Sequence, residues 1–596
     1  MTTGAIVTTI VLAASVGMTL MWIGIIACAT VIGVCVLAKI ASMILKWLFL
    51  AREPSVSGTP SITSAQLREE GDRRVIGDSW ITRRDGILQV YLQGAPFTIG
   101  YTSARLTSDL MAELEESLLR SVRQYVRSWV ATWLLAHIVM VRSRHLPRYV
   151  SDELKMEILG LSRGHTNYHP ELGPLFNRLL GYHAGHDIAH SVEDTPLASK
   201  RAVEDSPQAI RQAASVESIA GCTAFAAWGS HVATGHVIVG RNCDLEAGPS
   251  FDVNKLVSFI RPNKGNAFIS VSWCGWLGVA TGMSTARLYV SINAAHTSDE
   301  RAMGTPIALV ARDALQYAST LQEAIEIIRE AEVFVNDGFL LADGKTGEAV
   351  IVEKSPRRTN VLTAGGDFIV SANHFYTPAF ADDKANRDFM ASSTSVARYE
   401  RMTELVEREA GGLDVAGAVA ILRDRRGKGD MDVGDGNRST ICPIIATHSV
   451  VADVTAGIMW VSASPHQLGA FVPFSVTDFG SHPAEAIPAD PFLTDGGHAR
   501  YLESESLLAR GEALFRRGHL EEARRALEGA RGLNPEYYRA HMLLGELALK
   551  EGAYDEARTR LTRAMDRQPP FKRHSDEIQA LLARAGKPKT QTASQA

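Results

Sequence analysis

The sequence predicts an α+β protein with antiparallel sheets, preceded by an apolar segment and followed by a helical repeat. Three observations carry this prediction. Between residues 222 and 475, short β-rich runs give way to one helical block and then return, which is the order of α+β proteins rather than regular strand–helix alternation. The first 38 residues contain no charged side chain. Residues 505–585 repeat themselves at a spacing of 34.

The composition is that of a folded globular protein. The 596 residues are 46% hydrophobic and 21% charged, which excludes disordered and fibrous classes. The formal net charge of -5 gives no reason to expect a nucleic-acid partner. The six cysteines include no CxxC pair, so neither a disulfide scaffold nor a zinc site built from cysteines is expected.

Residues 1–50 are predicted to anchor the chain in a membrane through an N-terminal transmembrane helix. The uncharged run before Lys39 is longer than the roughly 20 residues that cross a bilayer core. It has no basic n-region, so an uncleaved anchor of one or two spans is expected rather than a signal peptide. Lys39, Lys46 and Arg52 all follow the run, which favours a cytoplasmic location for the rest of the chain. The alternative is a buried helix of a soluble protein.

The C-terminal region contains two copies of one helical unit. Small residues recur at matching places, as at Gly511 and Gly545, which lie 34 positions apart. This period and these residue types over 505–585 resemble the tetratricopeptide repeat, in which small side chains let paired helices approach closely. Such repeats either bind proteins or pack on a neighbouring domain, so a protein partner is one expectation here. Residues 586–596 are predicted to form a disordered tail.

Composition also marks the boundaries between these parts. Residues 51–66 and 476–504 are rich in Pro, Gly, Ser and Asp, and both are predicted to be linkers. The residues between them form two segments that differ in predicted secondary structure. Segment 67–221 becomes helical after a strand-like run that extends to Tyr101, whereas segment 222–475 is rich in strands.

The sequence pattern changes from helical to strand-like at Gly221-Cys222-Thr223. This cysteine opens a predicted β-hairpin whose return strand carries Gly240-Arg241-Asn242-Cys243-Asp244. The arrangement resembles the N-terminal-nucleophile (Ntn) hydrolases, and most closely the peptidase C45 family of autoproteolytic acyltransferases, typified by acyl-coenzyme A:6-aminopenicillanic-acid acyltransferase. Choloylglycine hydrolases and penicillin V acylases share the same core. Four further runs resemble elements of the C45 family in the expected order, namely GAPFTIGY at 94–101, LGVATGMSTARLYVSIN at 277–293, SANHF at 371–375 and ICPIIATHSVVADVTAGIMWVSAS at 441–464.

This resemblance implies a fold and an activity. The fold is the αββα sandwich of the Ntn hydrolases, in which 67–221 is the segment before the cleavage site and 222–475 is the catalytic core. The activity is self-cleavage between Gly221 and Cys222, followed by attack on an acyl amide or thioester through an acyl-enzyme on Cys222. The class needs neither a metal nor an organic cofactor.

The chemistry of the class explains why a cysteine must become N-terminal. A thiol with a pKa near 8.5 is mostly protonated at neutral pH and needs a base. The α-amine of the same residue, with a pKa of about 7.7–8.0, can be that base, but only after the Gly221–Cys222 peptide is cut. Glycine suits the position before the cut because it has no Cβ and tolerates a strained peptide.

The resemblance also implies roles for individual residues. Cys222 corresponds to the nucleophile and its α-amine to the general base. The Asp244 carboxylate corresponds to the group that holds this amine, and the Arg241 guanidinium to a charge that favours the thiolate. The other matched positions are Asn373 and Asn293, at the two oxyanion-stabilising positions, and Arg438, at a late arginine that orients the site.

Ordinary structural roles are the alternatives to these assignments. Arg241 and Asp244 would then form a structural ion pair, and Asn373 would cap a turn. Cys243 and Cys274 are expected to be core side chains. Two alternative functions also stay open. One is a choloylglycine or penicillin V acylase type of hydrolase without transfer activity, and the other is an inactive membrane scaffold with a protein-binding repeat.

Three histidines form a second group outside the motifs. His183, His186 and His190 are spaced three and four residues apart, which places them along one face of a helix. A metal site is one interpretation of this spacing. We favour the other interpretation, in which these side chains cap and pack the helical segment against the core, so no metal ligand is predicted.

Overall fold

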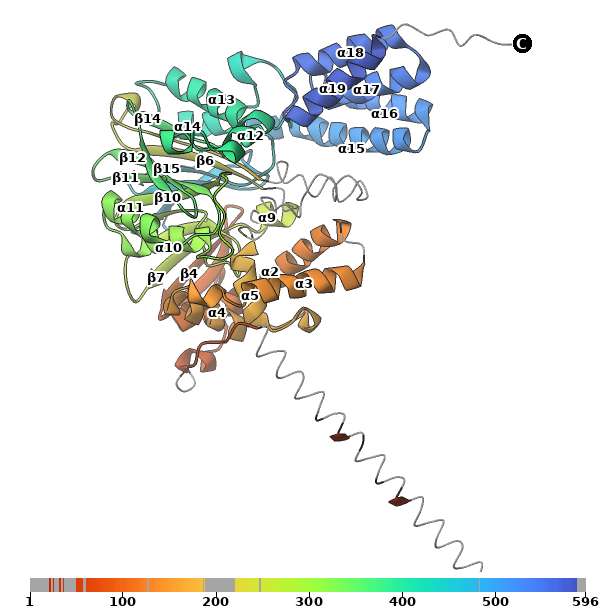
Figure 1. Ribbon diagram of the computed structural model, residues 1–596. Helices are drawn as coiled ribbons and strands as arrows, with labels where there is room; N and C mark the ends of the chain where they lie inside the picture. The colour runs from red at the N-terminus through yellow and green to blue at the C-terminus, as the bar shows by residue number, and fades with distance from the viewer. Residues whose placement is uncertain are drawn as a thin grey trace, which may run out of the picture.

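A computed structural model gives the arrangement of the chain (Figure 1). Two β-sheets pack face to face, helices cover their outer faces, and a separate group of helices forms the C-terminal part. The predicted α+β class is therefore confirmed. The structure describes residues 50–56, 60–125, 128–185, 187, 220–245, 248–481 and 483–586, with a few single positions between 21 and 36.

The larger sheet has eleven strands and joins the N-terminal segment to the rest of the fold. Neighbouring strands are antiparallel, except that β4 (Ile87–Gly94) and β7 (Leu256–Pro262) run parallel. The prediction of purely antiparallel sheets is corrected here, because the long connection between these two strands allows a crossover. On the β4 side lie β3 (Ser79–Arg84), β2 (Arg73–Ile76) and β1 (Arg68–Glu70), and on the β7 side lie β8 (Phe268–Ser272), β9 (Thr281–Ser284), β10 (Leu288–Ala294), β11 (Asp337–Asp343), β12 (Glu348–Lys354) and β13 (Thr359–Thr363).

The smaller sheet has six strands, all antiparallel, and it begins at the predicted cleavage site. Its hairpin of β5 (Ala220–Ala227) and β6 (Ile238–Leu245) lies between β14 (Phe368–Ser371) and β15 (Ala446–Asp453). Strand β5 runs through Gly221 and Cys222, so the structure corresponds to the precursor before any cleavage. Beyond β15 follow β16 (Ile458–Ser462) and β17 (Phe471–Ser475).

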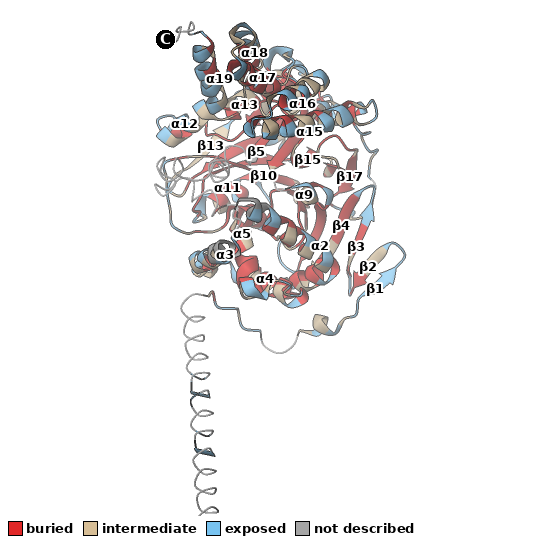
Figure 2. Ribbon diagram, turned by 90° about the vertical axis from the view of Figure 1, so that its right-hand side faces the viewer, coloured by how far each residue is buried: buried red, intermediate tan, exposed pale blue. Residues whose placement is uncertain are grey.

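The space between the sheets is filled by apolar side chains. Ala224 of β5 and Val239 of β6 belong to the same buried cluster as Val257 and Phe259 of β7. Successive residues of a strand point to opposite faces, so Phe225 of β5 packs instead in a cluster with the outer helices. Figure 2 shows strands of both sheets as largely buried, whereas β1 is exposed at the edge of the larger sheet.

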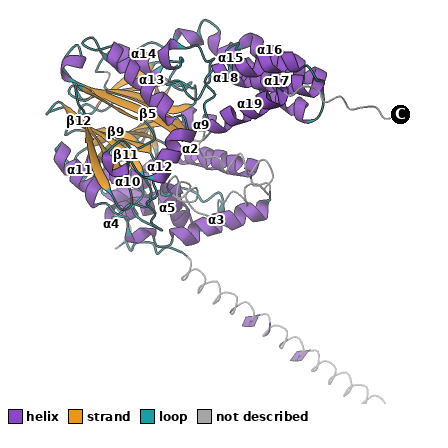
Figure 3. Cartoon of the chain, turned by 45° about the horizontal axis from the view of Figure 1, so that its top comes forward, coloured by secondary structure: helices purple, strands orange, loops and turns teal. Residues whose placement is uncertain are grey.

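Helices form the two outer layers (Figure 3). One layer packs against the larger sheet through a cluster that the helices share with its strands, and the other packs in the same way against the smaller sheet. The first layer contains α2 (Pro96–Tyr125), α3 (Trp129–Ser143), α4 (Asp152–Gly164), α5 (Leu175–His183), α10 (Ile307–Tyr317) and α11 (Leu321–Glu330), the second contains α13 (Ser395–Arg408) and α14 (Val415–Leu422), and α9 (Pro249–Val253) and α12 (Lys384–Ser392) lie in connections.

The segment before Gly221 is held firmly against the segment after it. Strand β4 pairs with β7 along seven residues. Helices α2 and α4 cross closely, because a Cβ on Gly100 would lie 1.9 Å from the Glu157 carbonyl oxygen. Glu157 in turn forms a bidentate ion pair with Arg312 of α10, at 2.9 and 2.7 Å, with both side chains fully buried. Sheet hydrogen bonds and a buried ion pair therefore join the two segments.

The strand-like run predicted to extend to Tyr101 is shorter in the structure. Strand β4 ends at Gly94, whose φ of 124° favours glycine, and α2 begins at Pro96. Proline suits the first turn of a helix because its missing N–H would have no partner there. The expectation of a strand from Ala95 to Tyr101 is therefore wrong.

The C-terminal helices form the predicted repeat. Gly511 packs against Leu527, and Gly545 packs in the same way against Leu561, with each added Cβ closer than 3 Å to the leucine side chain. The small residues thus let each helix pair approach closely, as the repeat requires. The helices are α15 (Gly497–Arg516), α16 (Leu520–Leu533), α17 (Tyr538–Glu551), α18 (Tyr554–Asp566) and α19 (Lys572–Ala585), of which α15 begins inside the segment expected to be a linker.

The repeat contacts a loop of the central domain and, through α19, the connecting helix α12. Asp435 donates its backbone N–H to the Asn534 side-chain oxygen at 3.1 Å, and Asn534 Nδ2 donates to the Asp435 carbonyl oxygen at 2.9 Å. Asn437 Nδ2 donates to the Arg567 carbonyl oxygen at 3.3 Å. The same loop continues into Arg438, one of the predicted site residues. The helical repeat therefore rests on the loop that carries a predicted site residue.

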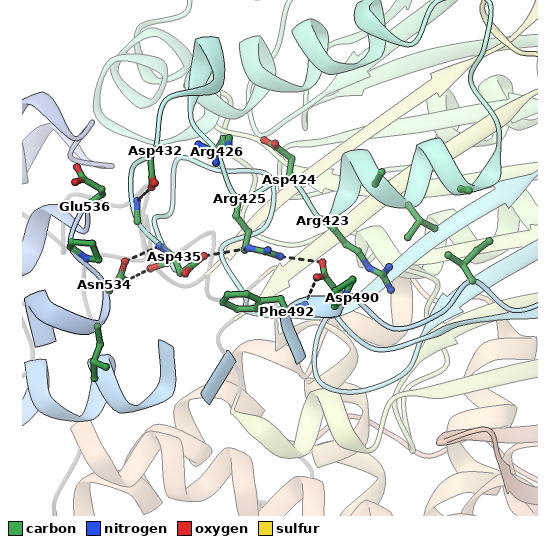
Figure 4. Close-up of a pocket in the computed structure, with 18 residues that line it drawn as sticks. Arg423, Asp424, Arg425, Arg426, Asp432, Asp435, Asp490, Phe492, Asn534 and Glu536 are labelled. Carbon is green, nitrogen blue, oxygen red and sulfur yellow. Dashed lines mark hydrogen bonds and ion pairs between the residues drawn. The ribbon is translucent and has the colours of Figure 1, made fainter. Parts of the chain in front are cut away.

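A cavity of about 640 Å³ lies at this junction (Figure 4). Arg425 crosses it to form ion pairs with Asp435 at 3.3 Å and Asp490 at 3.1 Å. The ring of Phe492 lies 4.0 Å below its guanidinium. None of the predicted site residues lines this cavity. The ion pairs of Arg425 therefore stay on the central-domain side of the junction, and the repeat reaches the cavity through Asn534, which accepts the Asp435 N–H.

The predicted membrane location is contradicted. Among the residues that the structure describes, no helix combines the length and the apolarity needed to span a membrane. Helix α2 has 30 residues but is amphipathic, and the apolar α3 has only 15, short of the roughly 20 that a span requires. The anchor predicted at 1–50 itself lies almost entirely outside the described residues.

Candidate active site

Cys222 lies near the start of β5, opposite Cys243 of β6. The register pairs Cys222 with Cys243 and Gly221 with Asp244. Because residues alternate between faces, Cys222, Cys243 and Arg241 point between the two sheets, whereas Asp244 points toward the outer helices. Cys222 is buried, with 9% of its surface exposed. The alternative of an Arg241–Asp244 ion pair does not fit this geometry, because the two side chains lie on opposite faces of the sheet.

The Arg241 guanidinium is the charge nearest the Cys222 thiol. Its Nη2 donates to Cys222 Sγ at 3.6 Å and to the Ile292 carbonyl oxygen at 2.5 Å. Its Nη1 donates to Thr281 Oγ1 and, at 2.9 Å, to His448 Nε2. Arg241 is itself 1% exposed. A buried positive charge held by four acceptors next to a thiol lowers the cost of forming the thiolate.

His448 supports Arg241 as a neutral acceptor. A guanidinium only donates, so Nε2 accepts and the neutral ring carries its hydrogen on Nδ1. Burial lowers the pKa of His448 to about 4, which keeps the ring neutral at physiological pH. Thr281 Oγ1 also contacts Nε2 at 2.9 Å. His448 faces Cys243 across β6 and β15, so it completes a row of Cys222, Cys243 and His448 on three neighbouring strands.

Asn373 holds the backbone of Cys222. It follows β14, and its Oδ1 accepts the Cys222 N–H at 2.9 Å. Its Nδ2 donates to the Ala294 carbonyl oxygen at 2.9 Å, and its own N–H donates to Ser395 Oγ at 2.8 Å. The amide of Asn373 therefore lies beside the peptide bond that the sequence marks for cleavage.

Arg398 of α13 is a site residue that the sequence analysis missed. Its Nη1 donates to the Cys222 carbonyl oxygen at 2.7 Å and to Thr223 Oγ1 at 2.5 Å. Its Nη2 donates to Asn373 Oδ1 at 2.7 Å. Nη2 also lies 3.4 Å from the point where a Cβ on Gly221 would be. A second buried arginine thus flanks the Gly221–Cys222 peptide, on the face opposite Arg241.

The Asp244 carboxylate is buried opposite Gly221. Neither of its oxygens has a hydrogen-bond partner among the described residues. Burial raises the pKa of Asp244 to about 7, although the charges of Arg398 and Arg438 act in the opposite direction. A buried carboxylate that lacks a donor is unfavourable and is rare in folded proteins.

The structure brings most of the predicted residues together, but not all. Cys222 contacts Arg241 and Asn373 directly. Arg438 acts on Asp244 through its charge, while the hydrogen bonds around Cys222 come from Arg398 instead. Asn293, predicted at the second oxyanion position, lies on β10 and donates from Nδ2 to Ser371 Oγ at 2.9 Å.

The histidine group is described only at its first member. His183 Nδ1 lies 2.6 Å from the Leu179 carbonyl oxygen, and its Nε2 accepts the Leu277 N–H at 2.9 Å. The Nε2 contact therefore joins α5 to the core, whereas the Nδ1 contact stays within α5. His186 and His190 lie outside the described residues. Among the residues the structure does describe, no cluster of His, Cys, Asp and Glu side chains is suited to hold a metal.

Comparison with known families gives two matches along the chain. Residues 232–464 match the model of the acyl-coenzyme A:6-aminopenicillanic acid acyl-transferase family. Residues 508–572 match a tetratricopeptide repeat model. The first match begins after Cys222, so it covers Arg241, Asp244, Asn293, Asn373 and Arg438 but not the cysteine.

Individual proteins resemble the chain more distantly. An uncharacterised protein of Archaeoglobus fulgidus is 23% identical over 291 residues, which is 45% of this chain and 46% of that protein. The chain therefore spans less than half the length of this relative. Two solved structures also match. A Caenorhabditis elegans N-acylethanolamine-hydrolyzing acid amidase ortholog is 18% identical and covers 39% of this chain and 93% of its own, at a TM-score of 0.30. A mutant conjugated bile acid hydrolase from Clostridium perfringens is 14% identical. It covers 44% of this chain and 95% of its own, also at a TM-score of 0.30.

Proposed function

Because the chain carries a domain of the acyl-coenzyme A:6-aminopenicillanic acid acyl-transferase family at residues 232–464, we propose that it is a self-cleaving cysteine enzyme. It cuts its own backbone between Gly221 and Cys222, and it then acts on a linear amide or thioester through an acyl-enzyme on Cys222. In this proposal, 67–221 and 222–475 are two fragments of one Ntn-hydrolase domain with the helix–sheet–sheet–helix order. The domain needs no metal for this chemistry.

The observation that carries the proposal is the state of Asp244 in the uncut chain. Its carboxylate is buried directly opposite Gly221 and lacks a hydrogen-bond donor among the described residues. Cleavage before Cys222 would create an ammonium group next to this carboxylate. The new charge would supply the missing partner and would lower the pKa of Asp244. The uncut chain thus holds a carboxylate whose natural partner exists only after cleavage.

The cleavage step follows from the contacts around the Gly221–Cys222 peptide. Cys222 Sγ attacks the Gly221 carbonyl carbon, the C–N bond breaks, and a thioester forms while the Cys222 amine is released. Water then hydrolyses the thioester and leaves a carboxylate on Gly221 and a free thiol on Cys222. The Arg241 guanidinium at 3.6 Å stabilises the attacking thiolate, Asn373 Oδ1 holds the Cys222 N–H, and the Arg398 guanidinium places a positive charge beside the developing oxyanion.

Turnover repeats the same attack on a substrate. The free amine of Cys222 takes the proton from Sγ, and the thiolate attacks the acyl carbon of the amide or thioester. The leaving group receives the proton, and water or an amine then resolves the acyl-enzyme. Linear N-acyl amides and acyl thioesters, tested with and without an added amine acceptor, distinguish hydrolysis from acyl transfer. An N-acylated acceptor marks transfer, and release of the free acid alone marks the choloylglycine-type alternative.

The masses of the purified protein test the proposal most directly. We expect fragments of 221 and 375 residues, with Cys222 as the first residue of the second fragment. Cys222→Ala should stay whole, whereas the matched variant Cys274→Ala, at another buried cysteine, should be cut normally. An uncut wild-type chain would overturn the proposal. A Cys222→Ala chain cut at the same bond would show that an outside protease makes the cut.

Replacing Asn373 with leucine should slow self-cleavage by about 10–100-fold, because it removes the Oδ1 acceptor that holds the Cys222 N–H and that Arg398 Nη2 donates to. The rate is measured by following full-length chain after a pulse of cell-free synthesis. Asn360→Ala, on β13, removes an amide that donates to Thr377 Oγ1 at 3.3 Å, and it should leave the rate unchanged. Equal rates for the wild type and Asn373→Leu would remove Asn373 from the mechanism.

The tetratricopeptide repeat adds a protein-binding function. Repeats of this kind present surfaces to other proteins, and we assign that role to residues 505–585. Because the repeat rests on the loop that leads to Arg438, a bound protein would be close to the active-site domain rather than tethered at a distance.

A further inference from the structure

Cys222 faces a second thiol that the proposed chemistry does not use. Cys243 lies directly opposite it on β6, and both side chains point to the same face of the sheet. Directly opposed residues of antiparallel strands have Cα atoms about 4.5–5.5 Å apart, which falls within the range of about 4.4–6.8 Å found in disulfides. All four cysteines that the structure describes are buried free thiols, and Cys222 and Cys243 are the two that pair in the strand register.

The two thiols also interact electrostatically. They share a hydrogen bond, which raises the pKa of Cys222 and lowers that of Cys243. The Arg241 guanidinium lowers the pKa of both thiols, although burial opposes it. The two thiols therefore lie next to a fixed positive charge, which favours a thiolate, and the shared hydrogen bond favours it on Cys243.

We propose that Cys222 and Cys243 form a reversible disulfide, and that this pair is an oxidation site that switches the enzyme off. The oxidant is a hydroperoxide. A thiolate of the pair attacks its O–O bond, gives a sulfenic acid and releases an alcohol, or water from hydrogen peroxide. The second thiol attacks this sulfur, the S–S bond forms and water leaves. The two cysteines together lose two electrons, which reduce the peroxide.

The disulfide has two consequences for Cys222. It removes the nucleophile from reaction, so an oxidised precursor neither cuts itself nor turns over substrate; this consequence rests on the proposed function. It also protects Cys222, because a sulfenic acid that no thiol resolves is oxidised further to sulfinic acid, which thiols do not reduce. The disulfide with Cys243 therefore protects Cys222, whichever of the two sulfurs is oxidised first.

The experiment is a peptide map of the full chain after hydrogen peroxide treatment and trypsin digestion without reductant. Trypsin cuts after Arg241 and so places the two cysteines on separate peptides, 212–241 and 242–255. We expect these two peptides to be linked, and dithiothreitol to release them. If self-cleavage has occurred, the first peptide begins at Cys222 instead of residue 212, so a failure of the proposed function is visible separately from a failure of the disulfide.

Matched variants give the control. Cys274→Ala should keep the linked pair, because Cys274 is buried but lies on no paired strand. Cys243→Ser should lose it and should accumulate sulfinic acid on Cys222 that dithiothreitol does not reverse. The proposal is overturned if the wild-type map shows both peptides unlinked while Cys222 is oxidised, or if Cys222 is linked to a cysteine other than Cys243.

Discussion

Replacing Glu157 with alanine is expected to lower the free energy of unfolding by about 3–5 kcal/mol, because it leaves the Arg312 charge buried without its partner. The pair is bidentate, and its side chains are 0% and 1% exposed. Arg312 Nη1 has one other acceptor, the Leu277 carbonyl oxygen at 3.1 Å. The measurement is urea unfolding of chains that Cys222→Ala keeps uncut.

Two further variants separate loss of the partner from loss of the charge. Glu157→Leu combined with Arg312→Met removes both charges and should cost far less than Glu157→Ala, because well-packed apolar side chains often replace a buried ion pair without loss. Glu326→Ala removes an exposed carboxylate that pairs with Arg329 on α11, and it should change stability by at most about 0.5 kcal/mol. A loss below about 1 kcal/mol for Glu157→Ala would contradict this account of the pair.

The position of this pair also bears on the fate of the two proposed fragments. Glu157 precedes the cleavage site and Arg312 follows it, and strands β4 and β7 join the same two segments. These contacts do not depend on the peptide bond before Cys222. We therefore expect the fragments to stay associated after cleavage and to separate only under denaturing conditions.

The hairpin at the site was predictable because its signals are local. The change to a strand-like pattern at Gly221 and the Gly240–Asp244 motif were enough to predict that β5 pairs with β6. This pairing brings Cys222 near Arg241. The 34-residue period was likewise enough to predict the C-terminal helices. Asn373 was predicted from the resemblance of SANHF to a short family motif. In the structure its Oδ1 accepts the Cys222 backbone N–H.

Arg398 was not predictable because its place depends on packing between distant elements. Nothing in the sequence of α13 marks one arginine among several, and only the packing of that helix against β5 brings Arg398 to the Cys222 carbonyl oxygen. The same holds for the parallel pair of β4 and β7. His448 had a weak signal, as a polar residue inside an apolar strand, but its contact with Arg241 required the register of β6 and β15.

Asp244 should make the uncut chain less stable as the pH rises from about 4 to about 7, and Asp244→Asn should remove this contribution. Burial raises the pKa of Asp244 to about 7, against an ordinary value of 3.8. Between these two pH values the folded chain keeps a proton on Asp244 that the unfolded chain has released, so stability falls as pH rises. The difference between these two pKa values corresponds to a loss of about 4 kcal/mol in the free energy of unfolding, and this loss is complete above about pH 7.

Urea unfolding of Cys222→Ala and of Cys222→Ala with Asp244→Asn, at about pH 4 and about pH 8, measures this contribution as the difference between the two chains. Asn keeps the size of the side chain but carries no charge, so the double variant should be the more stable chain at the higher pH. In the cut wild type the sign should reverse, because the Cys222 ammonium would lower the pKa of Asp244 and make the ionised pair stabilising near neutral pH. If Asp244→Asn destabilises the uncut chain at the higher pH, the carboxylate already has a partner before cleavage. Cleavage would then not be what supplies that partner.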